Sequence, residues 1–311
     1  MIKAGKERYA LNTSKYIGKG ELQVLLGGIL WGTIGLFIWL MKAQGACAEW
    51  ISFLRMAFAC LIMLAVTLAR LGPAALRIPK RSMLACALLG LICHGIYNIF
   101  YSFAVTLAGV AISAVLLNIA PLFTALFSVL LFRERLSRLK LLALIINVAG
   151  CILAATGGQV DLAGISALGL LCGVAAGLCY AMTAILGRIA GNTTDVFVMS
   201  TWSYGWAALF LLLWVLIRGS ELLLTAPVLG LGFAYALLPT ALAYILYYRG
   251  VNAVKSVSSV PVLASLESVT AVLIGVLLLK EQIGIVHVAG MVLVLFSLPL
   301  MNRQPASSTT A

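Results

Sequence analysis

Apolar residues recur along this chain in runs of about 20, and short polar or glycine-containing links separate the runs. A helix of that length crosses a hydrocarbon layer of about 30 Å. Helices satisfy their own backbone hydrogen bonds in lipid, whereas a membrane barrel would show alternating strands of about ten residues. The pattern therefore predicts an all-α polytopic membrane protein with ten transmembrane helices, over residues 22–41, 50–69, 83–106, 109–132, 138–156, 164–187, 196–217, 225–248, 256–279 and 283–301.

The composition agrees with this pattern. Of the 311 residues, 63% are hydrophobic and 10% are charged, against about 45–50% and about 25% in a soluble domain. The first apolar run has full spanning length, so we expect a retained helix and not a cleaved signal peptide. The seven cysteines lie scattered through apolar segments, without a CxxC motif or a Cys/His spacing suited to zinc. We therefore expect neither a metal nor a cofactor.

The basic residues give an orientation. With the N-terminus inside, 17 of the 21 lysines and arginines fall on the inner side, three fall outside, and Arg55 lies within a span. The positive-inside rule accounts for this distribution, so the net charge of +12 needs no nucleic acid and suits anionic lipid. We expect a plasma (inner) membrane protein with both ends cytoplasmic, a basic tail at 1–21 and a disordered tail at 302–311.

The second half of the chain repeats the first. At an offset of 147 residues, the Arg133-Glu134 ending of the fourth span meets Lys280-Glu281, and Tyr97 meets Tyr244. The repeats are expected at 22–156 and 164–301. Each holds five spans, an odd number, so the second copy must cross the membrane in the opposite sense. Inverted five-helix repeats are typical of secondary transporters, whose substrate site lies near the midplane between the halves.

Specific stretches carry a resemblance to a known family: Trp31-Gly32, Phe53-Leu54-Arg55, Ala120-Pro121-Leu122-Phe123 through Leu136, and Ser265-Leu266-Glu267-Ser268-Val269 through Glu281. With them the chain resembles the drug/metabolite transporter (DMT) superfamily, EamA family, over residues 22–301. The resemblance implies ten helices in two repeats that move small metabolites, often outward. Many relatives have a proline where this chain has Ser268, so we expect the second half to lack that proline kink.

Glu267 lies near the middle of the ninth span, roughly 18 Å from either end. Ionisable residues at this depth are rare and mark ion or substrate paths, and burial disfavours the ionised form. Three roles stay open: carrying a proton as access alternates, binding a substrate ammonium, or joining two helices as a structural carboxyl. The repeat partner of Glu267 is Ala120, so this charge occurs in one half only.

Arg55 is the basic residue inside a span. It either snorkels to the interface, pairs with Glu267, or binds a substrate carboxylate with its planar guanidinium.

Other polar and aromatic residues are candidates for the lining of a central cavity. Spacings of three and four predict a stripe on one side of the third span, formed by His94, Tyr97, Asn98 and Tyr101. Tyr244 and Tyr248 repeat its tyrosines. For tyrosines near span ends, Tyr101 and Tyr248, an interfacial belt is the alternative. His94 is either a proton carrier or a hydrogen-bonded packing residue.

Two further candidates have packing alternatives. Trp31 forms either a cavity wall or a packing contact beside Gly32. Asn118 either donates to substrate or bridges helices.

These residues favour a transporter that moves small metabolites by alternating access and works as an exporter. We expect amino acids or related amines first, with Arg55 on the carboxylate, Glu267 on the ammonium and aromatic walls around the side chain. The alternative is a carrier of sugars, nucleosides or amphipathic drugs in which Glu267 serves only proton coupling.

An intramembrane enzyme is remote, because the chain has no HExxH motif and no paired intramembrane aspartates. The expected partners are a small-molecule substrate, the lipid bilayer and a proton as candidate coupling ion. The expected assembly is a monomer or weak homodimer.

Overall fold

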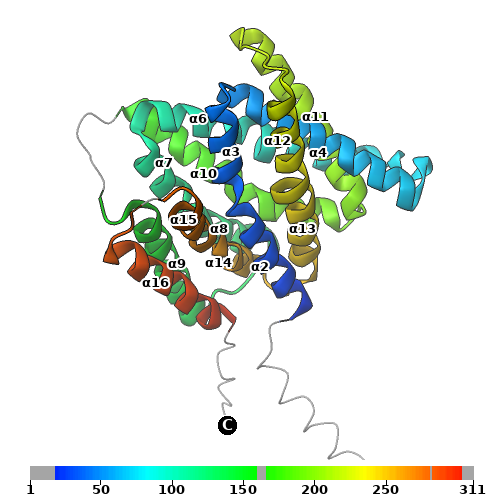
Figure 1. The fold of residues 1–311 in the computed structure, drawn as a ribbon. Helices are drawn as coiled ribbons and strands as arrows, with labels where there is room; N and C mark the ends of the chain where they lie inside the picture. Colours follow the sequence, from blue (N-terminus) through cyan, green and yellow to red (C-terminus); the bar gives the residue numbers. More distant parts are fainter. Residues whose placement is uncertain (1–17, 160–165, 281, 303–311) are drawn as a thin grey trace, which may run out of the picture.

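The computed structural model describes residues 18–159, 166–280 and 282–302, and within these ranges every regular element is a helix (Figure 1). The all-α prediction is therefore confirmed for this part of the chain. The elements of the first half are α2 (Lys19–Trp31), α3 (Ile34–Ala43), α4 (Ala48–Leu71), η1 (Pro73–Leu76), α5 (Lys80–Leu88), η2 (Leu89–Ile96), α6 (Tyr97–Ala108), α7 (Val110–Leu117), α8 (Ala120–Phe132) and α9 (Arg138–Thr156). Those of the second half are α10 (Ala167–Gly191), α11 (Val196–Arg218), α12 (Ala226–Ala236), η3 (Leu237–Leu242), α13 (Ala243–Ala253), η4 (Val257–Ser259), α14 (Val260–Ala264), α15 (Leu266–Leu278) and α16 (Ile285–Asn302).

The spans follow the predicted ones closely. Among the described residues, nine helical stretches are long and apolar enough to cross a membrane, and Ile285–Met301 is a shorter apolar helix in the tenth place. The largest difference is in the eighth span, which continues to Ala253 instead of ending at 248. Residues 1–17 of the expected basic tail, the start of the expected sixth span, Glu281, and residues 303–311 of the expected C-terminal tail lie outside the described residues.

Three spans that the apolar pattern predicts as continuous helices are broken. The first turns at Gly32-Thr33, the fourth at Asn118-Ile119 and the ninth at Ser265. An apolar run gives no sign of such a break, because hydropathy does not report backbone geometry. The second half has Ser268 in place of the proline, yet its helix still breaks three residues earlier, at Ser265.

The same irregularities recur at the offset of the sequence repeat. Asn118 and Ser265, at the two breaks, are 147 residues apart, and π-helical segments occur in the third span at Leu89–Ile96 and in the eighth at Leu237–Leu242. The described non-glycine residues with positive φ are Arg133 (φ 53°) and Lys280 (φ 55°), also 147 apart. The two halves therefore share backbone details that side-chain similarity alone would not require. The sixth span, by contrast, is continuous where the first is broken.

The two halves interlock through glycines. A Cβ on Gly28 would collide with the carbonyl oxygen of Ala264, and one on Gly177 would lie 2.9 Å from the carbonyl oxygen of Leu116. The first span of each half therefore packs against the fourth span of the other half. In Figure 1, α2 lies between α13 and the pair α14–α15, and α9 lies beside α16.

A carboxylate also joins the halves. Glu134, which follows α8, accepts hydrogen bonds from the backbone N–H of Val257 (2.6 Å) and Ser258 (3.2 Å) and from the Ser256 hydroxyl (2.9 Å). The ammonium of Lys140 donates to the same hydroxyl at 2.9 Å. These bonds satisfy backbone donors at the start of the ninth span, so the end of the fourth span fixes where the ninth begins.

We expect Gly28→Ala to lower the folding stability by about 1–3 kcal/mol, because the added methyl group overpacks the contact between α2 and α14. Gly35→Ala is the matched control in the same span, since a Cβ there meets nothing within 4 Å. Thermal unfolding of the purified protein in detergent measures both variants. Equal melting temperatures for the two would contradict the close contact at Gly28.

Candidate functional site

The break in the first span brings α2 against the start of α15. The Thr33 hydroxyl donates to the carbonyl oxygen of Leu30 at 2.7 Å, which satisfies an acceptor that the break releases. A Cβ on Gly32 would lie 2.8 Å from the carbonyl oxygen of Glu267. The small residue therefore lets Trp31 and Glu267 come together from opposite halves.

Glu267 lies in the first turn of α15 and is half-buried. Its carboxylate accepts a hydrogen bond from the Tyr180 hydroxyl at 3.0 Å. The N-terminal end of a helix carries partial positive charge, which favours an anion there. The break at Ser265 thus gives the carboxylate a favourable field that a continuous helix would not supply.

Aromatic rings from five spans gather beside Glu267. We call this group the aromatic cluster; it consists of Trp31, Tyr97, Tyr101, Tyr180, Tyr204, Tyr244, Tyr247 and Tyr248. The Trp31 ring centroid lies 4.7 Å from that of Tyr244 and 4.6 Å from that of Tyr247. The Tyr97 centroid lies 5.9 Å from that of Tyr180, the residue bonded to Glu267. The carboxylate is therefore joined to the aromatic cluster through the Tyr180 hydroxyl.

Two polar atoms of the aromatic cluster are buried and unpartnered. The indole N–H of Trp31 and the hydroxyl of Tyr204 have no hydrogen-bond partner among the described residues, although Trp31 is only 3% exposed and Tyr204 is fully buried. Such atoms are costly unless something binds them. They are available to a polar group that enters the cluster.

His94 lies in the π-helical segment η2 and is buried. Its Nε2 is 3.2 Å from the Tyr248 hydroxyl, and its ring meets Tyr244 edge-on at 4.9 Å between centroids. These contacts correspond to the packing alternative for this histidine. Because Tyr248 is fully buried, the interfacial-belt alternative is wrong for that tyrosine.

The predicted polar stripe of the third span divides. Tyr97 faces the aromatic cluster, whereas Asn98 donates to the carbonyl oxygen of His94 at 2.6 Å and accepts from the Ser52 hydroxyl of α4 at 3.3 Å. The π-helical segment changes the register in which these side chains follow one another. Asn118 lies half-buried at the break that ends α7.

Arg55 is buried within α4, with 7% of its surface exposed, so it does not snorkel. Its Nε donates to the Thr240 hydroxyl at 2.9 Å and its Nη1 to the Tyr235 hydroxyl at 3.2 Å, while its guanidinium carbon lies 4.9 Å from the Tyr235 ring centroid. Arg55 therefore bonds to Thr240 and Tyr235, whereas the Glu267 carboxylate accepts its side-chain hydrogen bond from Tyr180. A guanidinium has five N–H donors, and these two bonds use one at Nε and one at Nη1.

Several residues of this region are not among the predicted site residues: Tyr180, Tyr204, Tyr235, Thr240 and Tyr247. The repeat pointed to tyrosines present in both halves, and these residues have no counterpart of their own type at the same offset. Counting aromatic residues near the middle of each span would have found Tyr180 and Tyr204.

The comparison with known families is decisive for the class of protein. The sequence profile of the EamA-like transporter family matches residues 18–156 and again residues 167–303. The chain belongs to this family. The resemblance seen in the sequence is thus confirmed, and the protein is a multi-pass membrane transporter built from two EamA units.

Individual relatives agree over nearly their full length. An uncharacterized transporter of Archaeoglobus fulgidus is 28% identical over 92% of this chain and 97% of its own. The uncharacterized inner membrane transporter YicL of Salmonella typhimurium is 24% identical over 91% and 95%. A crystal structure of a protein that shares 20% identity matches with a TM-score of 0.79 over 92% of this chain and 98% of its own, which shows the shared fold.

A double-mutant cycle between Tyr180→Phe and Glu267→Gln tests the hydrogen bond in this transporter. We expect a coupling energy of about 1–2 kcal/mol in unfolding titrations with a denaturing detergent, because the hydroxyl partner of a half-buried carboxylate is removed without a change in ring volume. Strictly additive effects of the two substitutions would show that the pair does not interact.

Proposed function

We propose that this transporter carries small amines, and amino acids first among them, outward across the inner membrane by alternating access. The observation that carries the proposal is the position of Glu267 at a helix break beside the aromatic cluster. An anion next to aromatic faces suits an ammonium group, which both the carboxylate and the ring quadrupoles attract.

The other half of an amino acid has candidate partners as well. Arg55 donates from Nε and Nη1 to Thr240 and Tyr235, and its other N–H groups suit a carboxylate. Thr240, which accepts the Nε hydrogen bond of Arg55, lies four residues before Tyr244 of the aromatic cluster. The guanidinium and the aromatic cluster therefore contact successive turns of the eighth span. Trp31, with its unpartnered indole N–H, is a further donor for substrate, while His94, Tyr97, Asn98, Asn118 and Tyr244 line or support the region.

Alternating access draws support from the interlocked repeats. Two similar halves of opposite orientation exchange inward-open and outward-open states of similar energy. We place both termini in the cytoplasm, with α2 beginning and α16 ending at the same end of the molecule (Figure 1). A monomer or weak homodimer suffices, and the proton is the candidate coupling ion at Glu267.

Counterflow in proteoliposomes tests the substrate class. We expect exchange of labelled leucine and of isopentylamine, which lacks the carboxylate, and little exchange of isocaproate, which lacks the ammonium. A panel with labelled sugars and nucleosides runs beside them. Exchange of a sugar or nucleoside in preference to every amine would overturn the proposal in favour of a carrier in which Glu267 serves proton coupling only.

The pH dependence tests Glu267 itself. An ionised carboxylate binds the ammonium, so wild-type affinity for isopentylamine should fall as the pH is lowered and the carboxylate takes up a proton. In Glu267→Gln we expect affinity at least about tenfold weaker at alkaline pH and no such pH dependence. Glu221→Gln, which removes an exposed carboxylate, is the control. If Glu267→Gln transports like wild type at every pH, neither role holds for this residue.

A further inference from the structure

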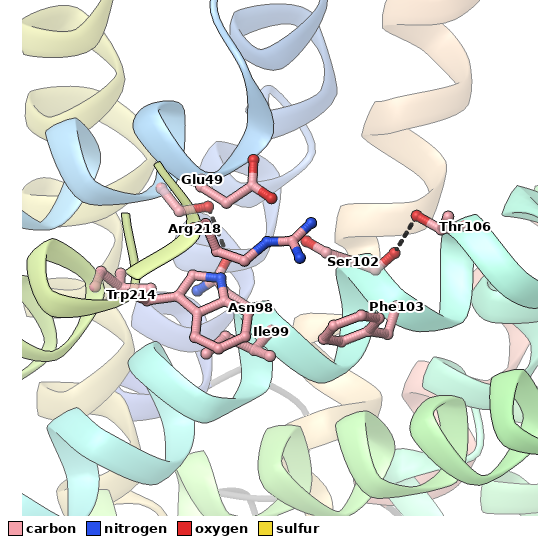
Figure 2. A pocket seen from close by; sticks show the side chains of 10 residues that line it. Glu49, Asn98, Ile99, Ser102, Phe103, Thr106, Trp214 and Arg218 are labelled. Atoms are coloured by element: carbon pink, nitrogen blue, oxygen red, sulfur yellow. Dashed lines mark hydrogen bonds between the residues drawn. The ribbon is translucent and has the colours of Figure 1, made fainter. Parts of the chain in front are cut away.

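A groove of about 100 Å³ lies between α4, α6 and α11, apart from the aromatic cluster (Figure 2). It is at the end of the molecule where α4 begins and α11 ends, because its lining includes Glu49 of the first turn of α4 and Arg218, the last residue of α11. In the proposed orientation this end faces outward. Neither the family nor the function proposed above assigns a role to it.

Two rows of polar residues follow the groove into the protein. On α4, Glu49, Ser52 and Arg55 succeed one another at intervals of three residues; on α6, Thr106, Ser102 and Asn98 do so at intervals of four. Such spacings put each row on one face of its helix. The Ser52 and Thr106 hydroxyls also donate to carbonyl oxygens one turn earlier in their own helices, at 2.9 Å to Ala48 and 2.8 Å to Ser102.

The inner end of the groove is closed by a hydrogen bond. The Ser52 hydroxyl shares its proton between the Ala48 carbonyl oxygen at 2.9 Å and the Asn98 side-chain oxygen at 3.3 Å, and the second contact joins the two rows. Beyond this bond, Arg55 comes one turn further along α4, and Tyr97 of the aromatic cluster is the neighbour of Asn98. The Ser52–Asn98 contact therefore lies between the outer part of the groove and the residues that lead toward the central site.

The outer end of the groove has a carboxylate and a guanidinium next to aromatic side chains. Figure 2 shows the Glu49 carboxylate and the Arg218 guanidinium turned into the same space. The Arg218 guanidinium carbon lies 6.0 Å from the Trp214 ring centroid, and the Phe103 ring packs edge-on against Trp214 at 6.3 Å. A ligand with an ammonium, an anionic group and a short apolar part matches this arrangement.

We propose that this groove is a second, peripheral binding site for small zwitterions, which the Ser52–Asn98 hydrogen bond separates from the site at Glu267. In assigning a free amino acid to the groove, the inference rests on the function proposed above. The head group of phosphatidylethanolamine carries the same pair of charges and is the other source of this chemistry.

Equilibrium binding of labelled leucine to the full chain, purified in detergent without added lipid, tests the proposal. We expect two leucines per wild-type chain. Glu49→Gln combined with Arg218→Gln weakens binding at one site about tenfold or more, and Glu267→Gln removes the other. The matched control combines Lys42→Gln with Glu221→Gln, which removes one charge of each sign at the same end but outside the groove, and keeps both sites.

The outcomes separate the two proposals. A single bound leucine that Glu267→Gln abolishes overturns the groove site and leaves the proposed function intact. If leucine binds nowhere, the proposed amino-acid function fails, and the groove is judged with glycerophosphoethanolamine. Binding of that compound to wild type and not to the Glu49/Arg218 variant supports the site, whereas equal binding or none overturns it.

The source of the ligand follows from the same measurement in nanodiscs. Leucine absent from the groove in phosphatidylethanolamine, but present in phosphatidylglycerol, identifies the lipid head group as the occupant. Leucine present in both identifies the free amino acid.

Discussion

A hydrocarbon layer tolerates irregular backbone only where protein surrounds it, since an unsatisfied peptide group costs several kcal/mol in lipid. The breaks in the first and ninth spans satisfy this requirement through local hydrogen bonds and through their packing against each other. The Thr33 and Ser265 hydroxyls donate to carbonyl oxygens near the breaks, at 2.7 Å to Leu30 and 2.6 Å to Val262. Ser265 also accepts from the buried amide of Asn147, which donates to Ser297 of α16 as well. The closeness of α2 to α14 and α15, permitted by Gly28 and Gly32, encloses the whole region in protein.

The position of Glu267 follows from that enclosure. Burial opposes its charge, while the start of a half-helix and the Tyr180 hydroxyl favour it. These opposing effects are the physical basis of the proposed role of Glu267 as the group that binds an ammonium or a proton. The corresponding break in the first half has Ala120 near the same point, so an almost symmetric backbone carries a carboxylate at only one of these two breaks.

The sequence predicted those features that depend only on the order of residues along the chain. Hydropathy found the spans, and an offset of 147 found pairs such as Arg133 and Lys280, whose shared left-handed backbone the structure then revealed. It was uninformative where three-dimensional packing decides. No pattern along the chain marks the π-helical segments at Leu89–Ile96 and Leu237–Leu242, and none pairs Tyr180 with Glu267 across more than eighty residues of chain. Arg55 could be read as interfacial or central from its position, and only the contacts with Thr240 and Tyr235 show it buried.

The interlocking glycines also bear on how the protein is made. The face of α2 that carries Gly28 packs on Ala264, a residue the ribosome adds only after eight spans have been synthesised. At about 5–20 residues per second this leaves the glycine face without its partner for roughly ten to fifty seconds. During that time the first span has only lipid or the insertion machinery to cover a surface shaped for backbone contact. Assembly in the membrane must therefore wait for the second half, and the early spans depend on staying mobile until it arrives.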